Sequence, residues 1–409
     1  MIKIKPALVA LLLILLLQGC QSGDDDPGGE DRVVLVSYNK IVTAAILQSV
    51  LDQLLSLTPE FNDQVIQNLT QYNVAIYKVV YKTTFRGAEI QASGACVIPE
   101  SNGAALPIAS YQHGTIFDEK KAPSNFTNIF DLNAAEMLIP QVLSACGFIC
   151  AVPDYIGFGA SGDILHPYHH RESTAAACVD MLRAVKEMCQ ELNVNFQERY
   201  FLFGYSEGGY ATLATLKKLQ ESYSGQIPVT ACAAGSGAYN FSSTITWYLQ
   251  QPILSGPAFL AFVFTAYKDV YGWTRSLCEI FKNPYCDRIA AGLFNGSYSE
   301  DYISGQLTSQ TQALFQPVFL ADYFGGGEQV LKNALIENSV YQGWFPSCPT
   351  RLYQGTADTI VPPFNASDAA AAFISAGAPA VTYRPLAGLT HDSAALPCFK
   401  DVLLWFKSF

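Results

Sequence analysis

The stretch Phe203–Ala214 reads FGYSEGGYATLA and places Ser206 between two glycines, each two residues away. An apolar run of strand type, YFLF, precedes it, and residues 207–220 have the apolar spacing of a helix. A strand, a sharp turn and a helix in this order form the G-x-S-x-G nucleophile elbow, which holds the serine at the helix N-terminus. Backbone N–H groups there can stabilise a developing oxyanion. We therefore predict that Ser206 is a nucleophile and that Glu207 supplies one oxyanion donor.

A serine becomes a good nucleophile when a base, held by a third group, takes its proton. After an elbow serine, the acid and then the histidine follow along the chain. Of the five histidines only His391 follows Ser206, in the polar turn LAGLTHDSAAL. The predicted acid is Asp358 in LYQGTADTIVPP, where a predicted strand ends. Asp392 is the alternative, although a residue adjacent to His391 is poorly placed to orient its ring.

The second oxyanion donor is expected in the loop after the apolar segment PIASYQ. Its backbone N–H would come from Gly114 or Thr115. We expect His113, in the same loop, to support the loop rather than to act as a base.

The rest of the chain alternates strand-like and helix-like segments, which predicts an α/β fold with a mostly parallel central sheet. The expected strands are residues 73–84, 89–100, 106–114, 147–155, 199–205, 227–237, 348–355 and 380–388. The expected helices are residues 34–55, 172–192, 207–220, 366–376 and 401–409. We find no internal repeat.

The alternation stops between residues 239 and 345, a region rich in aromatic residues. We interpret it as a helical lid or cap inserted between core segments at residues 37–238 and 346–409. Ligand sites often lie where an insertion covers the carboxyl ends of strands. A packed subdomain without a chemical role is the alternative.

The composition limits the class of partner. Of the 409 residues, 50% are hydrophobic and 14% are charged, which suits a large buried core rather than a disordered chain. The net charge is −11, and no basic patch is evident. Nucleic acid is therefore not expected as a partner.

The N-terminus has the pattern of an export signal. Two lysines precede an eleven-residue apolar run, Ala7–Leu17, which is too short to span a membrane. The segment LQGC resembles the bacterial lipobox, so residues 1–19 are a predicted lipoprotein signal peptide and Cys20 the lipidated residue. Residues 20–36 read as a flexible acidic tether. Acidic residues after Cys20 resemble the surface-export signal of Bacteroidetes lipoproteins, and a plain spacer is the alternative.

Several segments together resemble the α/β-hydrolases of the secretory lipase and esterase group. They are YQHGT, PDYIGFGASGDILHPYHH, GYSEGGYATLA, GTADTIVPP and the late THD, in this order between residues 72 and 409. The resemblance implies hydrolysis of carboxylic esters without a cofactor, and a lid where residues 239–345 lie. The first fifty residues and the inserted region carry no motif of that group.

Ten cysteines follow Cys20, an even number that permits disulfides in an exported protein. We predict the pairs Cys278–Cys286 and Cys348–Cys398. No cysteine pair has zinc-site spacing. The histidines at 166, 169 and 170, with Asp163 and Glu172 nearby, form a weak ligand set, and we predict no metal site.

The sequence leaves two other functions open. A serine peptidase of the same fold would use the same three residue types. A non-catalytic surface-binding lipoprotein would have kept only the fold. The order of Ser206, Asp358 and His391 along the chain argues against the second alternative, and the oligomeric state is not predicted.

Overall fold

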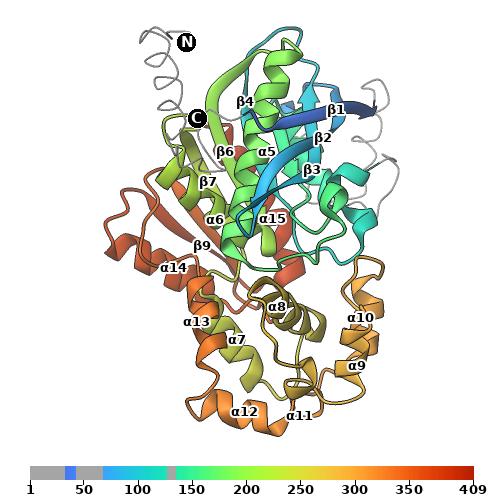
Figure 1. Ribbon diagram of the computed structural model, residues 1–409. Helices are drawn as coiled ribbons and strands as arrows, with labels where there is room; N and C mark the ends of the chain where they lie inside the picture. The colour runs from blue at the N-terminus through green and yellow to red at the C-terminus, as the bar shows by residue number, and fades with distance from the viewer. Residues whose placement is uncertain (1–32, 43–67, 127–134) are drawn as a thin grey trace, which may run out of the picture. The chain divides into compact units, whose positions relative to one another are not determined.

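The computed structural model describes residues 33–42, 68–126 and 135–409 (Figure 1). These described residues all belong to one compact unit. The predicted signal peptide, Cys20 and most of the acidic tether lie outside the described residues. Within the described part, no helix is both long enough and apolar enough to cross a membrane.

In the described residues, nine strands form one sheet in the order β1-β2-β3-β5-β4-β6-β7-β8-β9. Their bounds are β1 Leu35–Val42, β2 Val74–Phe85, β3 Ala88–Pro99, β4 Leu106–Gln112, β5 Ile149–Pro153, β6 Phe196–Tyr205, β7 Val229–Gly235, β8 Thr350–Gly355 and β9 Val381–Leu386. The pairs from β5 to β9 are all parallel, whereas β1, β2 and β3 are antiparallel to their neighbours. The predicted α/β fold with a mostly parallel sheet is confirmed.

Helices cover both faces of this sheet because successive side chains of a buried strand point to opposite faces. In β6, Tyr200 and Leu202 pack into the cluster that contains α5 (Arg171–Glu191) and α6 (Glu207–Ser222). Phe201 and Phe203 pack into the opposite cluster, with α4 (Ala135–Ala145) and α15 (His391–Phe406). A further helix, α14 (Phe364–Ser375), joins the α5–α6 side. Helices are expected here because parallel strands are joined by crossover connections, which are usually helical.

The prediction of a helix over residues 34–55 is wrong for its described part. Residues 35–42 form β1, an edge strand in which Leu35 pairs with Tyr81 and Tyr38 with Val79 of β2. Its β-branched residues favour an extended backbone, and the open edge of β2 supplies the hydrogen-bond partners. Residues 43–55 lie outside the described residues.

Between β7 and β8 the chain forms a run of helices (Figure 1). Their bounds are α7 Phe241–Gln250, α8 Pro257–Val270, α9 Tyr285–Ala290, α10 Glu300–Gln306, α11 Thr311–Leu314, α12 Pro317–Phe324 and α13 Gln329–Glu337. Their buried apolar side chains form a core in which aromatic residues such as Phe264, Phe281 and Phe315 pack against one another. This core explains the aromatic content of the region.

One of the two predicted disulfides is present. Cys278 and Cys286 are bonded, with their Cα atoms 5.0 Å apart. The Cys348–Cys398 prediction is wrong, because both residues are buried free thiols. Cys348 packs in the cluster on the α5–α6 face of the sheet and Cys398 in the cluster on the α15 face. A disulfide cannot bridge the two faces because it requires Cα atoms within about 7 Å.

Candidate active site

Ser206 lies at the turn between β6 and α6, in a backbone conformation with a positive φ of 60° and a ψ of −124°. Such a conformation is strained for a residue with a Cβ and is held by its surroundings. The flanking glycines allow close backbone approach. A Cβ on Gly208 would lie 1.9 Å from the Gln112 carbonyl oxygen, and one on Gly204 would lie 2.2 Å from that of Gly208. The GxSxG spacing is therefore required by packing against β4.

His391 is the first residue of α15, whose N-cap is Thr390. Its Nε2 lies 2.9 Å from Ser206 Oγ, and its Nδ1 lies 2.7 Å from Asp358 Oδ2. The Tyr205 hydroxyl donates to the His391 carbonyl oxygen at 2.7 Å, which fixes the backbone of the histidine beside the elbow. Three residues that are far apart in the sequence thus form one continuous hydrogen-bonded chain.

Asp358 lies in the turn after β8 and is buried. Its Oδ1 accepts the backbone N–H groups of Ile360 at 2.9 Å and Val361 at 2.8 Å. Its Oδ2 accepts the Gln354 side-chain amide at 2.9 Å in addition to His391. These donors fix the orientation of the carboxylate. Asp392, the alternative acid, is exposed.

The predicted second oxyanion loop, which contains Gly114 and Thr115, is supported by the DYIGFG segment. The Tyr155 hydroxyl donates to the His113 carbonyl oxygen at 2.9 Å. The His113 ring is buried, with Nδ1 2.6 Å from the Gly114 carbonyl oxygen and Nε2 3.3 Å from that of Asp154. His113 therefore supports the loop. Thr115 lines the same cavity as Ser206 and Glu207.

Glu207 forms a buried pair with His166 that sequence reasoning did not anticipate. Its Oε1 lies 2.9 Å from His166 Nε2, while His166 Nδ1 lies 2.6 Å from the Ile156 carbonyl oxygen. Burial alone raises the pKa of the Glu207 carboxyl, but nearby histidines, His166 first, outweigh burial and leave the pKa below its ordinary value. The pair joins the first turn of α6 to the loop after β5.

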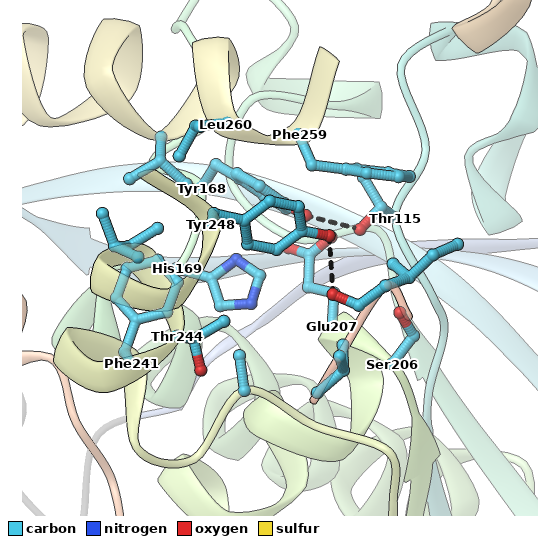
Figure 2. Close-up of a pocket in the computed structure, with 15 residues that line it drawn as sticks. Thr115, Tyr168, His169, Ser206, Glu207, Phe241, Thr244, Tyr248, Phe259 and Leu260 are labelled. Atoms are coloured by element: carbon cyan, nitrogen blue, oxygen red, sulfur yellow. Dashed lines mark hydrogen bonds between the residues drawn. The ribbon is translucent and has the colours of Figure 1, made fainter. Parts of the chain in front are cut away.

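A cavity opens beside Ser206 (Figure 2). Its lining is mostly apolar and comes from the elbow, the loops after β4, β5, β7 and β8, and helices α7 and α8. Phe241, Ile245, Phe259, Leu260 and Val263 supply much of this surface. A mostly apolar lining with a few polar groups is typical of a small-molecule site.

The three histidines considered as metal ligands point to different partners. His166 pairs with Glu207, His169 lines the cavity, and His170 caps the N-terminus of α5. Among the described residues, the group with metal-ligand geometry is Cys278, Cys286 and Asp287, and its two sulfurs form a disulfide.

Residues 121–408 match the model of the secretory lipase family. The chain belongs to that family. No curated protein matches it.

Several solved structures resemble this member of the secretory lipase family over most of its length. A candidate hydrolase from Legionella pneumophila is 27% identical, with a TM-score of 0.81 over 92% of this chain and 98% of that protein. The rice cell wall degrading esterase LipA from Xanthomonas oryzae, in a ligand-bound form, is 22% identical, with a TM-score of 0.77 over 91% of this chain and 97% of LipA. Candida antarctica lipase A in its closed state is 15% identical, with a TM-score of 0.62 over 87% and 77% of the two chains. The α/β-hydrolase fold is confirmed, and the family makes this chain a carboxylic ester hydrolase.

Proposed function

We propose that this member of the secretory lipase family is an exported serine hydrolase that cleaves carboxylic esters through a triad of Ser206, His391 and Asp358. The observation that carries the proposal is the hydrogen-bonded chain from Ser206 Oγ to His391 Nε2 at 2.9 Å and from His391 Nδ1 to Asp358 Oδ2 at 2.7 Å. The distances suit proton transfer from the serine to the imidazole.

In this mechanism Ser206 Oγ attacks the ester carbonyl carbon while His391 Nε2 takes its proton. Asp358 holds Nδ1–H and stabilises the imidazolium that forms. His391 then gives the proton to the leaving alcohol, and the acyl group remains on Ser206 Oγ. Water, deprotonated by His391, releases the acid and restores the serine.

The oxyanion formed in each attack needs two backbone N–H donors. We assign them to Glu207, at the first residue of α6, and to Gly114 or Thr115. Support comes from the position of Glu207 immediately after Ser206 and from Thr115 in the wall of the same cavity. The Glu207 carboxylate would oppose a nearby oxyanion, and its pairing with His166 reduces that repulsion.

We assign the acyl group to the cavity beside Ser206 and a covering role to residues 239–345. The acyl group stays bound to Ser206 after the alcohol leaves, so it is the part of the ester that an apolar cavity must hold. Leu260 and Val263 of α8 and Phe241 of α7 support the assignment, because the inserted helices supply them to the wall.

We also propose that the protein is anchored to a bacterial membrane by acyl chains on Cys20, at the inner membrane or at the outer membrane and cell surface. The lipobox-like LQGC and the membership of a secretory family support export. The acidic residues that follow support the surface as the destination.

Ser206→Ala tests the proposed reaction. We expect the variant to lose hydrolysis of p-nitrophenyl esters by about 10⁴-fold or more while keeping its unfolding midpoint. The wild type should also react with a fluorophosphonate probe at Ser206, and the variant should not. Turnover within tenfold of wild type would contradict the role of Ser206, and faster cleavage of peptide amides than of esters would favour a peptidase.

A further inference from the structure

His169 is held rigidly in the wall of the cavity beside Ser206. Its backbone is left-handed, with φ 55°, and its ring stacks on Phe241 at 4.7 Å with an interplanar angle of 1°. Tyr168 meets the ring edge-on at 4.3 Å. The His169 carbonyl oxygen accepts the hydroxyls of Tyr210 at 2.9 Å and Tyr267 at 3.1 Å. Ring and backbone are therefore both fixed in place.

The ring has a polar atom that the protein leaves unpaired. His169 is 5% exposed, and its Nδ1 has no hydrogen-bond partner within the described part of the chain. Burial lowers the pKa of His169 to about 4, so the imidazole is neutral near pH 7, with one N–H donor and one acceptor nitrogen. Leaving such a group unpaired in an apolar wall is costly, and a structure normally avoids it.

Other polar side chains of the cavity are satisfied within the protein. The Thr244 hydroxyl donates to the Asn240 carbonyl oxygen at 2.9 Å. The Tyr248 hydroxyl donates to the Ile360 carbonyl oxygen at 2.6 Å, as Figure 2 shows by a dashed line. Figure 2 also shows the His169 imidazole among the lining side chains, directed into the space between them. The imidazole thus differs from its neighbours in offering an unused hydrogen bond.

We infer that His169 is a specificity-determining residue that pairs with a hydroxyl or carbonyl group on the acyl chain of the substrate. The inference rests on the proposed function, in which the acyl group occupies this cavity. A hydroxyl is the best match because it can both donate to and accept from a neutral imidazole. The preferred substrates are therefore esters of hydroxylated acyl chains, rather than plain alkanoate esters of equal length.

The test compares p-nitrophenyl esters of hydroxyalkanoic acids, from butanoate to octanoate with the hydroxyl at successive carbons, against the parent alkanoates. For the wild type, kcat/KM should favour the hydroxylated ester about tenfold at one position. His169→Phe keeps a ring that can stack on Phe241 but removes both nitrogens, and it should abolish the preference. Thr244→Val is the matched control, since Thr244 lines the same cavity with a satisfied hydroxyl, and it should keep the preference.

Equal kcat/KM for both ester series in the wild type would overturn the inference and would mean that water satisfies the imidazole. A preference that survives in His169→Phe would overturn the assignment to His169. A second measurement does not depend on turnover. In the Ser206→Ala background, calorimetry should show about tenfold tighter binding of the matching hydroxyalkanamide than of the alkanamide, and His169→Phe should remove the difference. If Ser206 proves not to be the nucleophile, this binding ratio still decides the role of His169.

Discussion

Replacing His169 with phenylalanine should change how the free energy of unfolding depends on pH. The pKa of the buried imidazole is about 4, whereas the ordinary value is 6.5, and burial is the main cause. Of the charged groups near the ring, Glu207 raises this pKa and His166 lowers it. The unfolded chain therefore binds a proton below pH 6.5 that the folded chain does not. Stability falls as the pH drops from 6.5 to 4 and is not affected further below that range.

The size of the effect follows from the two pKa values. Each pH unit within this range costs about 1.4 kcal/mol, so His169 destabilises the wild type by about 2 kcal/mol at pH 5 and about 3 kcal/mol at pH 4. His169→Phe cannot take up the proton. Whatever its stability at pH 7, the variant should gain about 2 kcal/mol relative to wild type between pH 7 and pH 5.

Urea unfolding of both proteins at pH 5, 6 and 7 measures the difference. The wild-type curve also contains His170, whose pKa is likewise lowered to about 4 by burial, but this contribution is shared by both proteins and cancels. Thr244→Val should run parallel to wild type because it removes no titratable group. A difference between His169→Phe and wild type that stays constant across this pH range would refute the reasoning, since it would mean that His169 is protonated in the folded state.

Three further predictions concern the triad, the cavity and the anchor. Asp358→Asn should lower kcat by about 10⁴-fold with little change in KM, because His391 loses the group that orients its ring. Steady-state kinetics on a p-nitrophenyl ester would measure the loss, and a kcat within tenfold of wild type would remove Asp358 from the triad. Leu260→Trp should fill part of the cavity and reduce the ratio of octanoate to acetate ester turnover by about tenfold, whereas an unchanged ratio would show that the acyl chain lies elsewhere. Cys20→Ala should move the protein from the membrane pellet to the soluble fraction of a lysate, and continued pelleting that detergent reverses would rule out acylation of Cys20 as the anchor.

The residues of the proposed triad could be picked out from the sequence because their signals are local or follow chain order. The GxSxG spacing around Ser206 reflects a steric requirement within a few residues, and glycine is the residue that meets it. His391 followed from order, since no other histidine lies after Ser206. The Cys278–Cys286 disulfide joins residues eight positions apart, where the intervening chain already brings the sulfurs near each other. In each case the sequence neighbourhood contains most of the physical constraint.

The structure of residues 35–42 and the pairing of Cys348 could not be predicted correctly from the sequence, because both depend on which surfaces meet after the chain has folded. Residues 35–42 have apolar spacing that also fits a helix, and only the open edge of β2 selects the strand. The sequence also suggested a disulfide between Cys348 and Cys398, but the two residues pack on opposite faces of the sheet.

The cavity depends on tertiary structure in the same way. His169 and Phe241 are 72 positions apart, and their stacking exists because α7 returns over the loop after β5. The sequence by itself determined the turn at Ser206, because short-range sterics decide it, and chain order pointed to Asp358 and His391 as the partners of the serine. Tertiary packing alone decided the shape of the cavity and the unpaired imidazole in its wall, because burial and hydrogen-bond satisfaction are properties of the assembled neighbours.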